Sequence, residues 1–135
     1  MNFGKSTEKS EVSRASQTKS IYMKHIKCVI VGDDFGGNNY KDALLITYTT
    51  NSFPGEHVSA VFDNYSANIM VEDQAINLQM FGTPGQHDYK NFRKLSYPNT
   101  DVFIIGFSLV RPVTLEDIET LWVPEIQQHC PGVPY

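Results

Sequence analysis

A glycine-rich stretch followed by a lysine is the first feature of this chain that could do chemistry. Loops that cradle phosphates read Gly-x-x-x-x-Gly-Lys-Ser/Thr, in which backbone N–H groups and the lysine bind phosphate and the hydroxyl binds Mg²⁺. Gly32 and Gly37 have this separation, but Asn38 and Asn39 follow, so this register lacks both the lysine and the hydroxyl. A second register places Lys41 at the lysine position and makes the loop three residues longer. Spacing alone leaves both registers open, beside an ordinary turn rich in Gly and Asn.

The second register contains two substitutions that oppose phosphate binding. Tyr40 stands where a glycine would let the backbone approach the phosphates, and Asp42 stands where the hydroxyl would bind Mg²⁺. The carboxylate of Asp42 offers the ion a hard oxygen, but it also places negative charge beside a polyanion. We therefore expect phosphate binding at this loop to be weakened.

The elements around this loop are those of an α/β sheet. Short apolar runs predict buried strands or a hairpin, and apolar residues at helical spacing predict helices. The predicted strands span residues 26–31, 61–71, 75–81 and 102–107, and the predicted helices span 41–48 and 115–126. Because strands alternate with helices, we expect a largely parallel sheet, in which ligands bind at the carboxyl ends of the strands. The loop after Val31 lies at such an end.

Composition limits what this chain can bind. Its 135 residues suffice for one compact domain with a core, since 41% are apolar. The formal net charge of -4 argues against binding nucleic acid or acidic membranes, which requires an excess of basic residues. Cys28 and Cys130 have the spacing of neither a disulfide framework nor a metal site, so we expect a reduced, cytoplasmic setting. Gly4 and Cys130 do not lie where lipidation enzymes act, and we expect no lipid anchor in this chain.

Residues 1–22 differ in amino-acid composition from the rest of the chain. They are rich in serine and in charged side chains and offer almost nothing apolar to bury. We expect a disordered polar tail over residues 1–22 and a single domain over residues 23–135.

Six short segments form a joint pattern that covers nearly everything after the tail. They are KCVIVGD (27–33), YTTNSFPGE (48–56), VFDNYSAN (61–68), GQ (85–86), LSYP (95–98) and FSLV (107–110). Together they resemble the front part of a Rho/Rac family small GTPase. The resemblance implies a P-loop NTPase-like three-layer sandwich that is incomplete, with strands one to four, a hairpin between the second and third, and helices on both faces.

The same resemblance assigns roles to individual residues. The nucleotide-binding positions correspond to Gly32, Asp33, Gly37, Lys41, Asp42, Phe53 and Gly85, and Gln86 matches the glutamine that orients the attacking water. The positions that bind effectors or regulators correspond to Val61, Phe62, Asp63, Tyr65, Tyr89, Leu95 and Tyr97. The family implies GTP or GDP with Mg²⁺ as ligands, and protein effectors and regulators of Rho/Rac GTPases as partners.

The departures from the family pattern fall at the positions that the resemblance associates with Mg²⁺ binding. Ala60 replaces a switch threonine, Gly82 replaces an aspartate, and Asp42 replaces the loop hydroxyl, so we expect no metal ligand among them. The guanine-recognition motif Asn-Lys-x-Asp would follow Tyr135, so we expect a C-terminally truncated domain with weak or lost nucleotide binding.

Three functions remain open at this stage. The first is a nucleotide-independent module that binds effectors or regulators in actin-cytoskeleton signalling, the second is a residual GTP-binding switch with slow hydrolysis, and the third is an inert gene fragment. The strand at 102–107 is expected to be an unpaired sheet edge, which would favour self-association.

Overall fold

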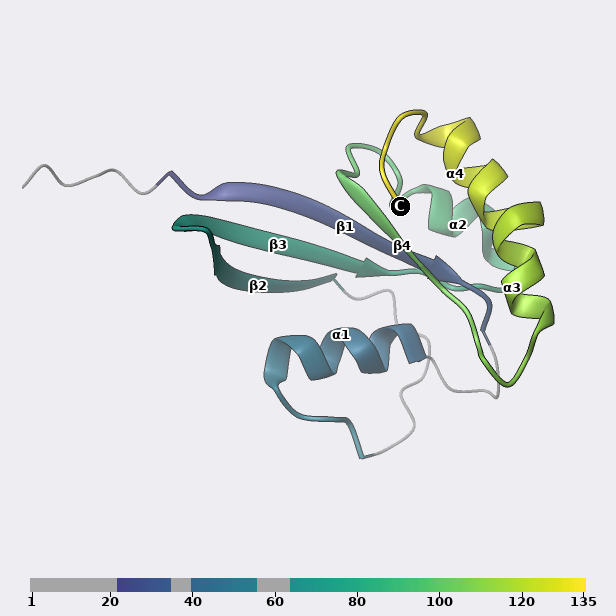
Figure 1. Ribbon diagram of the computed structural model, residues 1–135, viewed down its shortest axis with the longest axis horizontal. Helices are drawn as coiled ribbons and strands as arrows, with labels where there is room; N and C mark the ends of the chain where they lie inside the picture. The colour runs from purple at the N-terminus through teal and green to yellow at the C-terminus, as the bar shows by residue number, and fades with distance from the viewer. Residues whose placement is uncertain (1–21, 35–39, 56–63) are drawn as a thin grey trace, which may run out of the picture.

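A mixed sheet with helices on both faces forms the domain in the computed structural model, which describes residues 22–34, 40–55 and 64–135 (Figure 1). The elements are β1 (Lys24–Gly32), α1 (Tyr40–Thr50), β2 (Asn64–Val71), β3 (Gln74–Gly82), η1 (His87–Tyr89), α2 (Lys90–Lys94), β4 (Val102–Gly106), α3 (Val113–Asp117), η2 (Ile118–Trp122) and α4 (Val123–His129). The strand order is β2-β3-β1-β4. β1 is parallel to both β3 and β4, and β2 is antiparallel to β3. The predicted α/β fold with a β2–β3 hairpin is confirmed.

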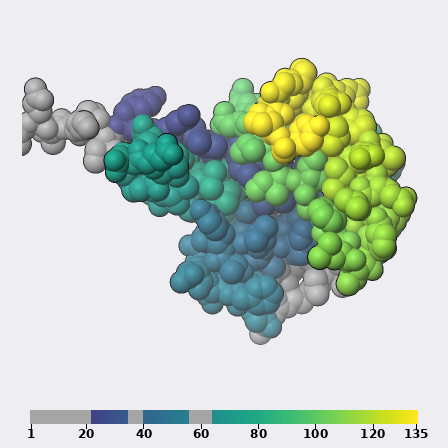
Figure 2. Space-filling view, in the orientation of Figure 1, coloured from purple at the N-terminus to yellow at the C-terminus, as the bar shows by residue number. Residues whose placement is uncertain are grey.

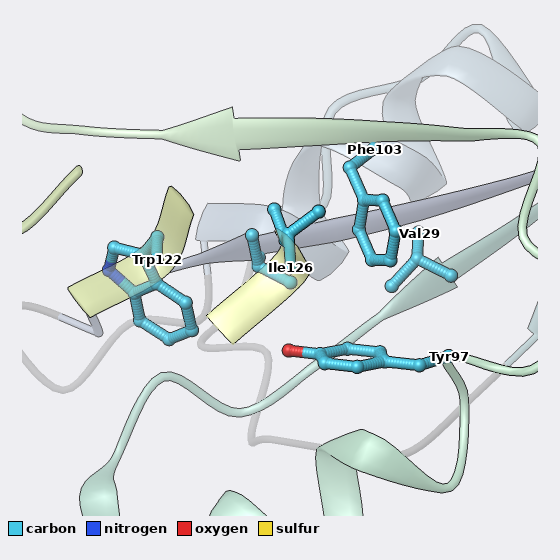
Figure 3. Close-up of a cluster of buried hydrophobic side chains, with 6 residues drawn as sticks. Val29, Tyr97, Phe103, Trp122 and Ile126 are labelled. Carbon is cyan, nitrogen blue, oxygen red and sulfur yellow. The ribbon is translucent and has the colours of Figure 1, made fainter. Parts of the chain in front are cut away.

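Both faces of the strand β1 are covered over residues 28–32, as the nearly continuous apolar sequence there predicts. The cluster beneath α1 consists of Cys28, Ile30, Leu45 and Met80. The cluster on the other face consists of Val29, Val31, Tyr97, Phe103, Trp122 and Ile126, five of which are labelled in Figure 3. α1 lies on one side of the sheet and α2 and α4 lie on the other (Figure 1). The three layers of the predicted sandwich are therefore present.

A two-residue turn joins β2 to β3. Glu72 and Asp73 both have positive φ, at 48° and 63°, which is the backbone of the tight hairpin turn that matches the twist of paired strands. The predicted join spans residues 72–74 and is one residue longer than the observed turn. The extra residue, Gln74, pairs with Val71 instead.

The last helical segment runs continuously from α3 through η2 to α4 and contains one wide turn. The five residues of η2 form a π turn. Pro124 follows at the start of α4 and has no N–H to donate to the carbonyl of Thr120, so the helix widens where an ordinary bond is missing. Trp122, at the end of the π turn, is fully buried in the core.

The C-terminal residues lie beside the edge strand β4 (Figure 2). The backbone N–H of Phe103 donates to the carbonyl oxygen of Pro134 at 2.9 Å, and Val133 packs against the core cluster. The expectation that residues 102–107 form an unpaired edge is therefore wrong at Phe103. β4 ends at Gly106, one residue earlier than predicted.

The tail predicted over residues 1–22 lies outside the described residues except for Tyr22, whose carbonyl accepts a 2.9 Å hydrogen bond from Gln74 Nε2. In the three described segments, no helix has the length and apolar character needed to cross a bilayer.

Candidate functional site

Lys41 is the centre of the site and is fully buried at the start of α1. Its ammonium donates at 2.9 Å to the carbonyl oxygen of Gly32 and forms a partly buried ion pair with the carboxylate of Asp34. The side chain thus reaches back to the loop after β1, as the register with Lys41 at the lysine position requires. Burial lowers the pKa of Lys41, although the negative charge of Asp34 opposes this effect.

Asp34 joins two loops through its carboxylate. One oxygen accepts from Lys41, and the other accepts from the backbone N–H of Gly85 at 2.7 Å. Gly85 follows β3, and a Cβ at this position would clash with the backbone of Gly32 and lie 2.5 Å from the backbone nitrogen of Asp34. Only glycine fits where the loops after β1 and β3 approach so closely.

Tyr40 fills the crevice where β1 and β4 end. A Cβ on Gly32, which has a φ of +137°, would lie 2.6 Å from the Tyr40 hydroxyl, and a Cβ on Gly106 would clash with the same ring. The Lys41 ammonium lies 4.7 Å from the ring centroid, within cation–π range. Burial, and then the charges of Asp34 and Asp33, raise the pKa of Tyr40. The carboxyl ends of parallel strands are where ligands bind in such sheets, and here an aromatic side chain of the protein occupies that place.

Asp42 belongs to the first turn of α1, like Lys41, and its side chain lies against Gly82 at the end of β3. The Asp42 side chain is 1% exposed, and a Cβ on Gly82 would collide with its carboxylate. The carboxylate therefore takes the space that a side chain at position 82 would need. Across the described parts of the chain, no three His, Cys, Asp or Glu side chains are grouped so that they could hold a metal ion.

A pocket of about 170 Å³ opens beside Asp34. It is lined by Asp33, Asp34, Gly85, Gln86, Arg111, Val113, Thr114 and Asp117. Burial and the neighbouring carboxylate of Asp117 raise the pKa of Asp33. The pocket is smaller than the roughly 300–1,000 Å³ of most small-molecule sites.

A buried ion pair fixes α2, the short helix that follows the Gly85 loop, against α4. Arg93 Nε and Nη2 each donate to the Glu125 carboxylate at 2.8 Å, and the Tyr97 hydroxyl donates to it at 2.7 Å. Arg93 Nη1 also donates at 3.0 Å to the carbonyl oxygen of Gln86, so the same guanidinium holds the loop after β3. The expectation that Tyr97 is exposed to partners is wrong, because its ring is 2% exposed within the core (Figure 3).

The remaining predicted residues are distributed around the molecule. Phe53 is 74% exposed and follows the far end of α1 from Lys41, so the structure does not bring it to the site. Tyr65 is half-buried on β2, whereas Tyr89 and Leu95 are exposed. Gly37, Ala60 and the effector-loop residues Val61, Phe62 and Asp63 lie outside the described residues.

Three residues that the sequence analysis did not assign to a function belong to the site or its surface. Asp34 was visible as the second of two adjacent acidic residues in a loop predicted to bind anions, where a carboxylate competes for the donors. Phe92 is 57% exposed, and its ring centroid lies 6.3 Å from that of Tyr89. Glu125 carries no such sequence signal, because a single acidic residue on an amphipathic helix is normally solvated.

A comparison with protein families matches residues 27–135 to the model described as the Ras family. The matched segment begins within β1 and includes every later element, and so it contains the whole site.

Proposed function

Because the chain belongs to the Ras family of small GTPases, we propose that it is a protein-binding module of the Rho/Rac type that works without a bound nucleotide. The state of Lys41 carries this proposal. A lysine that binds phosphate needs an ammonium that the ligand can reach. The Lys41 side chain is 0% exposed, and its ammonium already donates to Gly32 and to the carboxylate of Asp34.

Proteins of the Ras family generally bind GTP or GDP together with Mg²⁺, and the residues of this chain do not fit that pair. Asp34 places a carboxylate between the two donors that would meet a phosphate, and Tyr40 fills the crevice at the strand ends. A second carboxylate, from Asp42, adds negative charge beside the same helix start. Phosphate oxygens brought to this place would meet like charge in a partly dehydrated setting, which is unfavourable.

The surface that we propose for partners lies on η1 and α2. Tyr89, Phe92 and Leu95 are 41%, 57% and 76% exposed, and large apolar and aromatic groups of this kind anchor protein interfaces. The buried Arg93 lies between them in sequence and fixes their helix to Glu125. A surface held in place by the protein itself loses little conformational freedom on binding. Val61, Phe62, Asp63 and Tyr65 are proposed as the second part of this surface, and effectors or regulators of Rho/Rac proteins in the cytoplasm as its partners.

A nucleotide titration and a capture assay on the purified full chain test this proposal. Fluorescent GTP and GDP, each with and without Mg²⁺, are titrated first, and we expect no saturable signal at micromolar protein. A set of immobilised GTPase-binding fragments of Rho/Rac effectors is then offered to the same nucleotide-free protein, and we expect capture by at least one of them. Saturable, Mg²⁺-dependent guanine nucleotide binding would overturn the proposal, and so would failure of every fragment to bind.

The variant Leu95→Asp distinguishes binding through the proposed surface from non-specific adsorption to the immobilised fragments. Leu95 is 76% exposed, so the charge is expected to leave the fold intact and to abolish capture. The matched control is Leu109→Asp, an 89% exposed leucine of the loop after β4, which is expected to bind like the unmodified chain.

A further inference from the structure

We infer that Asp34 is a built-in anion that occupies the oxyanion-binding position of this chain and thereby holds the loop after β3 in one conformation. The inference rests on the proposed function, because it explains how a surface of this family is kept in place without a nucleotide.

Two donors from separate parts of the chain converge on this one carboxylate. Lys41 comes from the start of α1, and the Gly85 N–H comes from the loop after β3, 51 residues further along the chain than Asp34. An ammonium and a backbone N–H directed at one point form the donor set that binds phosphate or sulfate in proteins. The donor set is therefore that of an oxyanion site, and the anion in it belongs to the protein.

The ion pair is buried at Lys41 and partly exposed at Asp34. Lys41 is 0% exposed, whereas the Asp34 side chain is 20% exposed and lines the pocket of about 170 Å³. If the carboxylate is removed, the Lys41 ammonium and the Gly85 N–H lose their shared acceptor, and the space between them adjoins this pocket. A small tetrahedral oxyanion is the ligand class that fits two such donors, and inorganic phosphate and pyrophosphate are its simplest members.

The carboxylate also connects the anion position to the partner surface. Gly85 precedes Gln86, whose carbonyl oxygen accepts from the buried Arg93, and Arg93 belongs to α2 with Phe92. Asp34 thus fixes the first residues of a short path that ends at the exposed rings of Tyr89 and Phe92. Loss of the carboxylate is expected to loosen this path, and a bound oxyanion is expected to restore it.

The test is a gain of binding in the variant Asp34→Ala. Inorganic phosphate and pyrophosphate are titrated by calorimetry into the variant and into the unmodified full chain, and melting temperatures are recorded with both anions. We expect the variant to bind pyrophosphate about tenfold to a hundredfold more tightly than the unmodified chain, the range that one charge-assisted hydrogen bond accounts for. Its melting temperature is expected to rise with anion concentration, as binding to the folded state alone requires.

The matched control is Asp33→Asn, which removes the same charge from the same pocket but leaves the carboxylate on Lys41 and Gly85. We expect no gain from this control. An equal gain in both variants would mean that general charge repulsion, and not occupation of the site, excludes anions, and it would overturn the inference.

A measurement on the unmodified chain covers the case in which Asp34→Ala does not fold. The Gly85 amide is expected to exchange with deuterium as slowly as core amides of β3, because its hydrogen bond to Asp34 must open first. Exchange at the rate of an unstructured amide would refute the inference. Nucleotide binding by the unmodified chain would refute the proposed function. An Asp34→Ala variant that folds but binds neither phosphate nor pyrophosphate would refute this inference alone.

Discussion

Replacing Glu125 by alanine removes the acceptor of three buried hydrogen bonds, two from Arg93 and one from Tyr97. The Arg93 side chain is 0% exposed and cannot reach water when its partner is lost. Its guanidinium keeps the bond to the Gln86 carbonyl and the contact with the Trp122 ring, whose centroid lies 4.7 Å away, but it has lost its counter-charge. The variant therefore leaves an uncompensated positive charge inside the domain.

The burial of the Arg93–Glu125 ion pair determines how much unfolding free energy the variant loses. Breaking a buried ion pair by removing one partner costs about 3 to 5 kcal/mol, because the remaining charge stays dehydrated. A single-domain protein has about 5 to 15 kcal/mol of stability in total, so Glu125→Ala removes a large part of it. Tyr97→Phe removes only one bond and leaves Glu125 paired with Arg93, so its cost is about 1 kcal/mol.

Urea denaturation followed by circular dichroism measures these differences, with thermal melting as a second probe. We expect Glu125→Ala to lower the melting temperature by about 10 to 20 °C and the free energy of unfolding in proportion. Glu119→Ala is the control, because Glu119 is exposed on the same helical segment and its loss is expected to cost less than about 0.5 kcal/mol. A loss below about 1 kcal/mol in Glu125→Ala would show that the ion pair does not hold α2 to α4.

The pH dependence of the same difference follows from the carboxyl group. Burial alone would raise the pKa of Glu125, but the hydrogen bonds from Arg93 and Tyr97 and the positive charges of Arg93 and Lys90 outweigh it and hold the pKa below its ordinary value of 4.5. A carboxyl whose pKa is lower in the folded state stabilises the fold fully above the unfolded pKa and loses that contribution as the pH falls through the folded pKa. The gap between the unmodified chain and Glu125→Ala is therefore expected to be constant near neutral pH and to shrink below pH 4.5. A gap that widens on acidification would contradict this sign.

Three smaller predictions concern the sheet and its surroundings. Gly82→Ala is expected to cost about 1 to 3 kcal/mol, because the new methyl group meets the Asp42 carboxylate. Adding Asp42→Ala removes the clash, so a double-mutant cycle should show a coupling above about 0.5 kcal/mol, and strictly additive costs would disprove the contact. The paired change Glu72→Asn and Asp73→Gly is expected to raise the free energy of unfolding by about 1 kcal/mol, because both positions have positive φ; urea titration measures it, and a loss would show that another backbone is adopted. Burial raises the pKa of Cys28 to about 11, so a thiol reagent at pH 8 is expected to leave this cysteine unmodified in the native protein and to label it in urea, as read by mass spectrometry.

The layered fold follows from short-range features of the sequence, and the site does not. The apolar run through Val29 and Val31 specifies a strand buried on both faces, because few other structures cover every side chain of such a run. Apolar residues at helical spacing likewise predict the segment that contains Trp122, although its π turn depends on the missing N–H of Pro124. Boundaries are off by one to three residues where a single residue, such as Gln74, can either extend a strand or belong to a turn.

The candidate site required spatial information that the sequence does not carry. Spacing alone left two registers of the loop open, of which only the second contains a lysine, and the packing of α1 on the sheet places Lys41 beside Gly32. The partner of that lysine, Asp34, was noticeable in the sequence as a second acid in the loop, but its pairing was not predictable because a loop acid is equally consistent with a solvated turn. Tyr97 was misjudged for a related reason, since a tyrosine near a helix end presents its ring either to solvent or to the core, and here the acceptor that buries it is 28 residues away.

The central position of β1 has a consequence for how the chain reaches its native state. Both neighbours of β1 in the sheet come much later in the chain, and the hydrogen bond between Lys27 and Asp101 spans 74 residues. Parallel pairings between such distant segments form slowly. The chain must first lose the entropy of closing a long loop, and only then do the contacts between the strands stabilise it. During translation the apolar run of β1 is therefore exposed before β3 has been synthesised, and its second edge stays unpaired until β4 has left the ribosome. Synthesis of this chain is expected to depend on chaperones that shield that run, and slower elongation just after β4 is expected to favour correct folding over aggregation.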